Sequence, residues 1–169
     1  MGKLLEYMQG IETGVSQVSE QMPTLPQQDV MLVRLLHLAA EGLTARFLDV
    51  LRPHGLNESD FRVLMQLYSC PSGSAYPSEL CAFVVQTPTN MTRIADALVR
   101  RKLVTRKPGE HDRRRIELRI TLAGRRFVGV LLPKLFPLLR TSFSGLDDRE
   151  KRTLQGLLQR VIVSVDETP

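Results

Sequence analysis

The sequence has few of the residues on which disulfide scaffolds, metal centres and common catalytic sites depend. Its two cysteines, Cys70 and Cys81, do not suggest the disulfide framework of a small secreted domain. The three histidines, His37, His54 and His111, lack metal-ligand spacing with one another or with the cysteines. The zinc-protease HExxH, Walker, dinucleotide-binding and nucleophile-elbow motifs are all missing. We therefore expect a protein that is not an enzyme and that holds no metal or cofactor.

Long hydrophobic runs are absent as well. The apolar stretch at residues 128–132 is too short to cross a bilayer and ends at Pro133. The sequence shows no cleavable signal peptide, no low-complexity tract and no internal repeat. These observations predict a cytoplasmic protein.

What the sequence does have is an uneven distribution of positive charge. The 169 residues are 43% hydrophobic and 24% charged, which is typical of a globular domain with its own core. Residues 93–126 contain twelve Lys/Arg and four Asp/Glu, a net of +8, so the remainder of the +5 chain carries −3. Such a concentration predicts a polyanionic partner. The alternative is a solvated basic face without a partner.

The most basic stretch has the pattern of a β-hairpin. Residues 103–107 and 116–121 are strand-like, and the second segment alternates apolar and charged side chains. Pro108 and Gly109 suit a turn at the tip, where three consecutive arginines follow. A narrow hairpin tipped with arginines can reach a phosphate backbone or enter a minor groove.

Helical patterns surround this hairpin. Upstream, hydrophobic spacing and cap residues predict helices at residues 29–51, 61–68, 78–84 and 88–101; downstream, one long helix starts at Thr121 and another near residue 147. Two short helices followed by a basic hairpin form a winged helix-turn-helix. The predicted fold class is therefore mainly α with a small β-wing (α+β), a winged helix-turn-helix with N- and C-terminal dimerisation helices.

We divide the chain into an N-terminal arm, residues 1–28, and one domain, residues 29–166. Within the domain, residues 57–121 form the DNA-binding lobe. Residues 29–52 and 122–166 have more apolar surface than a small lobe can bury, which predicts that they intertwine with a second copy. The alternative is that they pad the core of a monomer. The arm begins with a possible short amphipathic helix, and the sequence leaves its order and role open.

Several of these segments resemble the MarR family of bacterial transcription regulators. The wing residues Asp112-Arg113-Arg114 are followed by Ile120-Thr121 and Gly124, as in the family's Asp-x-Arg, strand, Leu/Ile-Thr-x-x-Gly signature. The closer likeness, over residues 57–58, 77–80, 89–96 and 111–114, is to the multidrug-efflux (Emr/Mpr-type) repressor branch. One departure is Lys102, where the family usually has glycine; a left-handed lysine there costs on the order of 1 kcal/mol.

The helix at residues 88–101 is the expected recognition helix, whose N-terminal turn enters the major groove. Its exposed polar candidates are Thr87, Thr89, Asn90, Thr92 and Arg93. Arginine can pair with guanine and asparagine with adenine, so Arg93 and Asn90 are the preferred base readers. Thr87 is at least as good a helix cap, and Ser78 could bind phosphate at the start of the preceding helix.

In the wing, the resemblance implies that Arg114 enters the minor groove and that Asp112 braces it. Bracing is physically reasonable, because a carboxylate facing phosphates would be repelled. Arg113 and Arg115 are expected to contact phosphates, which gives affinity without sequence information.

The resemblance also implies a small aromatic or phenolic effector bound where the dimer helices meet the DNA-binding lobe. Two basic candidates could bind an anionic group of the effector, Arg34 and His37. Four apolar candidates could line the wall of its cavity: Phe47, Phe61, Met65 and Tyr68. For each of the six, the alternative is an ordinary core or surface residue. Cys70 or Cys81 could sense oxidants, although inert cysteine is the commoner case.

Together these features predict a nucleoid-associated, homodimeric repressor of efflux or detoxification genes. It would bind a pseudo-palindromic operator in double-stranded DNA and be released by a small hydrophobic or phenolic ligand. The alternatives are a regulator or architectural DNA-binding protein without an effector, a cysteine redox sensor and, least favoured, an enzyme acting on a small aromatic substrate.

Overall fold

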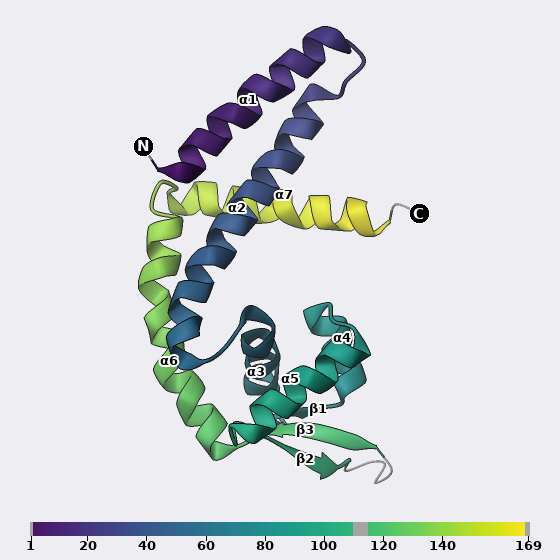
Figure 1. Ribbon diagram of the computed structural model, residues 1–169, viewed down its shortest axis with the longest axis vertical. Helices are drawn as coiled ribbons and strands as arrows, with labels where there is room; N and C mark the ends of the chain where they lie inside the picture. The colour runs from purple at the N-terminus through teal and green to yellow at the C-terminus, as the bar shows by residue number, and fades with distance from the viewer. Residues whose placement is uncertain (1, 110–114, 168–169) are drawn as a thin grey trace. The chain divides into compact units, whose positions relative to one another are not determined.

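The structure is a computed structural model that describes residues 2–109 and 115–167 (Figure 1). The chain forms two compact units, Met1–Val128 and Gly129–Pro169. The described elements, in chain order, are α1 Lys3–Gln21, α2 Gln27–Leu51, a 3-10 turn at Arg52–His54, α3 Glu58–Ser69, β1 Ser74–Ala75, α4 Pro77–Val84, α5 Pro88–Arg100, β2 Val104–Pro108, β3 Ile116–Ile120, α6 Leu122–Ser142 and α7 Asp148–Asp166.

The N-terminal residues form a longer helix than the sequence suggested. α1 packs along α2 as a helical hairpin (Figure 1). Val15 is buried, and the Leu4 side chain lies against Gly42, where a Cβ would come within 2.8 Å of it. The glycine therefore lets the two helices approach closely. α2 begins at Gln27, two residues before the expected start.

The lobe formed by α3, α4, α5 and the sheet has its own apolar core. Asn57 and Asp60 form a capping box that starts α3 at Glu58, three residues earlier than expected. Val63, Leu64 and Leu67 of α3 are fully buried. Met91, Ile94 and Leu98 of α5 are also buried, as the helical spacing predicted.

The wing belongs to a three-stranded antiparallel sheet of order β1-β3-β2. β2 and β3 pair from Val104 opposite Ile120 to Pro108 opposite Ile116. The expectation that Pro108 forms the turn was wrong, because it is the last paired residue of β2, where its missing N–H is tolerated. The two-residue strand β1, at Ser74 and Ala75, pairs with β3.

The joint between the wing and α6 explains the signature residues that follow the hairpin. The Thr121 hydroxyl donates to the Lys102 carbonyl oxygen at 2.7 Å and accepts from the Gly124 N–H at 2.9 Å. A Cβ on Gly124 would clash with the Leu103 carbonyl oxygen. Lys102 adopts a left-handed backbone at this turn, with φ 60°.

In the second unit, α7 packs with the end of α6 to form an apolar groove. Asp147 caps α7 through bonds from the backbone N–H groups of Arg149 and Glu150, and Glu150 completes the capping box. The groove has a volume of about 570 Å³ and is lined chiefly by Leu139, Phe143, Leu154, Leu158 and Ile162.

Within residues 2–109 and 115–167, no helix is long and apolar enough to cross a membrane. The same residues contain no group of three or more His, Cys, Asp or Glu side chains that could hold a metal ion.

Candidate nucleic-acid interface

The helix-turn-helix consists of α4, a three-residue turn and α5. α4 ends at Val84, and the left-handed backbone of the next residue, Val85 (φ 51°, ψ 61°), reverses the chain. α5 starts at Pro88, and the hydroxyl of the preceding residue, Thr87, accepts from the Asn90 N–H at 3.3 Å. Thr87 is therefore the cap of α5, which was one of its two expected roles. The turn fixes where the first residues of α5 point.

The outer face of α5 is polar and accessible. Thr89, Thr92 and Arg93 are exposed, opposite the buried apolar face of the helix. Asn90 is half-buried. Its side-chain amide forms hydrogen bonds with Arg93, at 3.0 Å, and with Gln86. The two predicted base readers thus contact each other. Gln86 was missed, although its spacing of four residues from Asn90 is that of helical neighbours.

The wing contacts the first turn of α4 through Arg115. Its guanidinium lies 4.0 Å from the centre of the Tyr76 ring and donates to the Ser78 hydroxyl at 3.4 Å. Both Ser78 and Arg115 are exposed, so this surface combines a helix start with a cation stacked on an aromatic ring. Tyr76 was not predicted to take part. The other wing candidates, Asp112, Arg113 and Arg114, lie outside the described residues.

Two further basic residues of the 93–126 segment hold the lobe together. Arg101 donates to the carbonyl oxygens of His54 and Gly55 at 2.6 and 2.8 Å, and stacks over Phe127 at 5.3 Å. Arg106 forms a 2.7 Å ion pair with Asp96, which ties β2 to α5. Both arginines therefore have structural partners, which the sequence alone did not reveal.

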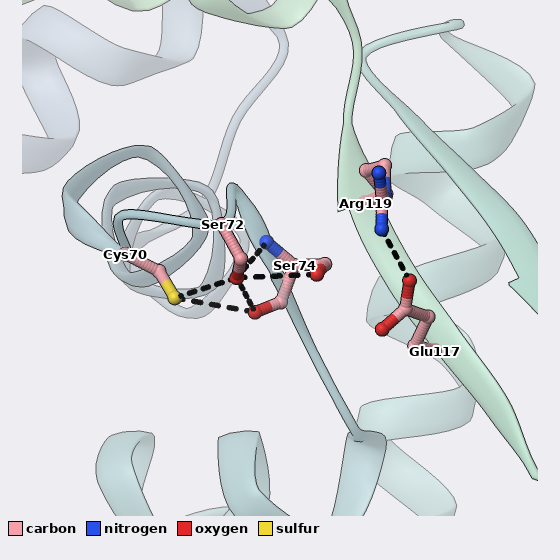
Figure 2. A network of polar contacts seen from close by, with 5 residues as sticks. All are labelled: Cys70, Ser72, Ser74, Glu117 and Arg119. Atoms are coloured by element: carbon pink, nitrogen blue, oxygen red, sulfur yellow. Dashed lines mark hydrogen bonds and ion pairs between the residues drawn. The ribbon is translucent and has the colours of Figure 1, made fainter. Parts of the chain in front are cut away.

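A polar network lies where β1 meets β3 (Figure 2). The Cys70 Sγ is 3.2 Å from the Ser72 hydroxyl and 3.3 Å from the Ser74 carbonyl oxygen. The bond with the Ser72 side chain lowers the pKa of the Cys70 thiol. On β3, Arg119 pairs with the buried Glu117 at 2.8 Å. The thiol therefore lies beside a strand of the wing sheet.

The effector candidates fall into two groups. Arg34 and His37 are exposed and line a groove of about 600 Å³ between α1 and α2, together with Tyr7 and Ile11. Phe47, Phe61, Met65 and Tyr68 are half-buried and are not part of its lining. Tyr68 instead lies under the Arg125 guanidinium, 6.0 Å from it.

The chain is similar to known regulators. A sequence profile of the MarR family matches residues 54–115, which contain α3, the helix-turn-helix and β2 of the wing. The transcriptional repressor MprA of Escherichia coli K12 is 33% identical over 143 residues, 84% of this chain and 81% of that protein. The regulator PrsX of Escherichia coli is 26% identical over 145 residues, 86% of this chain and 87% of its own.

Solved structures share the fold. The crystal structure of a MarR mutant from Escherichia coli in complex with operator DNA matches with a TM-score of 0.70 at 24% identity, covering 85% of this chain and 96% of that one. AbsC from Streptomyces coelicolor, a MarR family transcriptional regulator, matches with a TM-score of 0.74 at 20% identity, covering 86% and 97%.

Proposed function

The chain belongs to the MarR family of DNA-binding transcriptional regulators, which are not enzymes, and on this premise we propose how it acts. It is a homodimeric repressor of efflux or detoxification genes, bound to a pseudo-palindromic operator near its own gene. A small hydrophobic or phenolic ligand releases it. It works in the cytoplasm, on the nucleoid.

The observation that carries this proposal is the surface of α5. A helix that buries Met91, Ile94 and Leu98 presents Thr89, Thr92 and Arg93 to solvent. A polar helix face beside a basic hairpin suits the major groove, with the wing reaching the neighbouring backbone.

In this arrangement Arg115 and Ser78 contact phosphate together, because both are exposed and the wing arginine bonds Ser78 at the first turn of α4. Arg113 also contacts phosphate, while Arg114 enters the minor groove with Asp112 as its brace.

The unpaired apolar surface of α7 supports the homodimer. Every residue of α7 is described, and none is buried. Leu157, Val161, Ile162, Val163 and Val165 are 45% to 70% exposed. A stripe of this kind marks an interaction surface. A second copy would cover it, with residues 29–52 and 122–166 as dimerisation helices and residues 57–121 as the DNA-binding lobe.

Ligand release follows from the geometry that a dimer imposes. Two recognition helices bind one operator only when their spacing matches the DNA, so a ligand that favours another spacing weakens binding. Arg34 and His37, on one wall of the α1–α2 groove, would meet an anionic group. Apolar contacts would come from Phe47 on α2 and from Phe61, Met65 and Tyr68 on α3.

Fluorescence anisotropy on DNA from the protein's own upstream region tests the proposal, with and without phenolic weak acids such as salicylate. We expect tight, sequence-selective binding that one compound weakens. Arg93→Ala should reduce selectivity, whereas Arg152→Ala, an equal loss of charge at an exposed position of α7, should not. Binding without sequence preference would favour an architectural protein. If no compound changes the affinity for DNA, release by such an effector is excluded.

A second candidate signal is oxidation, favoured by the partly accessible Cys70 thiol and its bonds to Ser72 and Ser74 (Figure 2). A hydroperoxide would oxidise the thiolate to a sulfenic acid and be reduced to the alcohol or water. The bulkier sulfur would disturb the turn before β1, which pairs with the wing strand β3. Peroxide should then weaken operator binding of the wild type and leave Cys70→Ser unaffected; equal effects on both would exclude this signal.

A further inference from the structure

We propose that Arg93 is the guanine-reading residue of α5, and that Gln86 and Asn90 are positioning residues that hold it for the DNA. This inference rests on the proposed function, because it assumes that α5 enters the major groove. It assigns a role to Gln86, a residue of the helix-turn-helix turn, and gives Asn90 a different role from that of an adenine reader.

Three side chains form a continuous chain of hydrogen bonds along the start of α5. The Arg93 Nε donates to the Asn90 Oδ1 at 3.0 Å. The Asn90 Nδ2 donates in turn to the Gln86 Oε1. Since a guanidinium has donors and no acceptor, the atom of Asn90 that faces Arg93 must be its oxygen. The amide nitrogen then necessarily faces Gln86, whose oxygen accepts.

Gln86 is itself anchored to the end of α4. Its backbone N–H donates to the Cys81 carbonyl oxygen at 3.0 Å, and its side-chain Nε2 lies 3.5 Å from the Val84 carbonyl oxygen. Its side chain is half-buried, whereas Arg93 is exposed. The chain of bonds therefore runs from a fixed point in the turn to the exposed arginine, and it limits the rotamers that Arg93 can adopt before DNA arrives.

The remaining hydrogen-bonding capacity of each side chain determines what it can read. An asparagine reads adenine with its oxygen and nitrogen together, and in Asn90 each of these atoms already has one protein partner, which fixes the plane of the amide. Asn90 is also half-buried, whereas Arg93 is exposed. Arg93 donates to Asn90 through its Nε, so its two terminal nitrogens are not used in that bond. Two parallel donors match the O6 and N7 acceptors of guanine. Hence the ordered chain favours one guanine in each half-site.

Sequence selection from a randomised operator library tests this inference, with nonspecific affinity and melting temperature measured for every variant. We expect the wild-type protein to select one guanine per half-site. Its preference for guanine over the other bases at that position should fall about tenfold in Arg93→Ala. Gln86→Leu and Asn90→Ala should weaken the same position by several-fold, without a matching loss at other positions. Replacing that guanine by 7-deazaguanine, which lacks the N7 acceptor, should lower the DNA affinity of the wild-type protein. It should leave the affinity of Arg93→Ala unchanged.

Two comparisons separate positioning from a general structural effect. Gln86→Glu keeps an acceptor toward Asn90 and should retain the guanine preference, although its negative charge lowers affinity uniformly. Gln86→Leu combined with Arg93→Ala should be no less selective than Arg93→Ala alone, because the two residues act as one unit.

The possible failures are distinguishable. If Asn90→Ala relaxes an adenine at a different position from Arg93→Ala, or if the double variant shows additive losses, Gln86 and Asn90 are not positioning residues, while the proposed regulator stands. If wild type selects no sequence at all, the proposed function fails, and this inference fails with it.

Discussion

Replacing Val85 by glycine should stabilise the protein, although it deletes an entire side chain. Val85 follows the last residue of α4 in a left-handed conformation, φ 51° and ψ 61°, and is 79% exposed. Glycine is the usual residue at such a helix end, and a β-branched residue there is an outlier. Because the valine side chain is mostly in solvent, little packing is lost when it is removed.

The magnitude follows from two opposing terms. The left-handed backbone costs a residue with a Cβ about 1–2 kcal/mol, and glycine avoids this cost. Glycine also gives the unfolded chain more freedom, which offsets about 0.4–1 kcal/mol of the gain. The difference predicts that Val85→Gly raises the free energy of unfolding by about 1 kcal/mol, which corresponds to a rise in melting temperature of about 2–4 °C for a chain of this size.

Thermal unfolding followed by circular dichroism at one fixed protein concentration measures this change, since association alters the apparent stability. Val85→Ala is the control: it removes the β-branch but keeps the Cβ, so it should gain less than half as much. A melting temperature that falls in Val85→Gly would refute the reasoning, because it would mean that the valine side chain contributes more than its backbone strain costs.

Three other changes have expected outcomes. Gly124→Ala places a Cβ against the Leu103 carbonyl oxygen and should lower stability by about 1–3 kcal/mol in denaturant titration; an unchanged midpoint would contradict the close approach. Asp147→Ala removes the α7 cap and should cost about 1 kcal/mol, with Asp147→Asn as the matched control that keeps a capping oxygen. Ser72→Ala removes the bond that lowers the pKa of Cys70, so the pKa rises, less thiolate is present at neutral pH, and alkylation by iodoacetamide slows; an unchanged rate–pH profile would exclude this bond as the cause.

The elements that could be predicted from sequence were those with a strong local signal. The apolar spacing of Met91, Ile94 and Leu98 determined the buried face of α5 because those residues alone set which side of the helix meets the core. The alternation of residues 116–120 likewise predicted β3. In each case the decisive interactions lie within a few residues along the chain.

What the sequence could not indicate depends on contacts between distant segments. β1 has two residues and no alternation of its own, so it exists because β3 offers an edge with which it pairs. In the sequence, Arg101 is one of several basic residues of the 93–126 segment. In the structure, its hydrogen bonds to the carbonyl oxygens of His54 and Gly55 hold it against the turn after α2. Gln86 had a local signal, its spacing from Asn90, but spacing alone did not show that Asn90 bonds Gln86 with its nitrogen and Arg93 with its oxygen.

The count of basic residues therefore overestimates the charge available to DNA. Within residues 93–126, Arg101 binds backbone carbonyls, Arg106 pairs with Asp96, and Arg119 pairs with the buried Glu117. A cation that binds a phosphate must release counterions from the DNA, and an arginine already neutralised by a carboxylate contributes less to that release. The three arginines instead stabilise α5, which contains Arg93, and strands β2 and β3, which form the wing. Rigid placement of a few exposed cations, more than the total positive charge, is what allows such a surface to distinguish one DNA sequence from another.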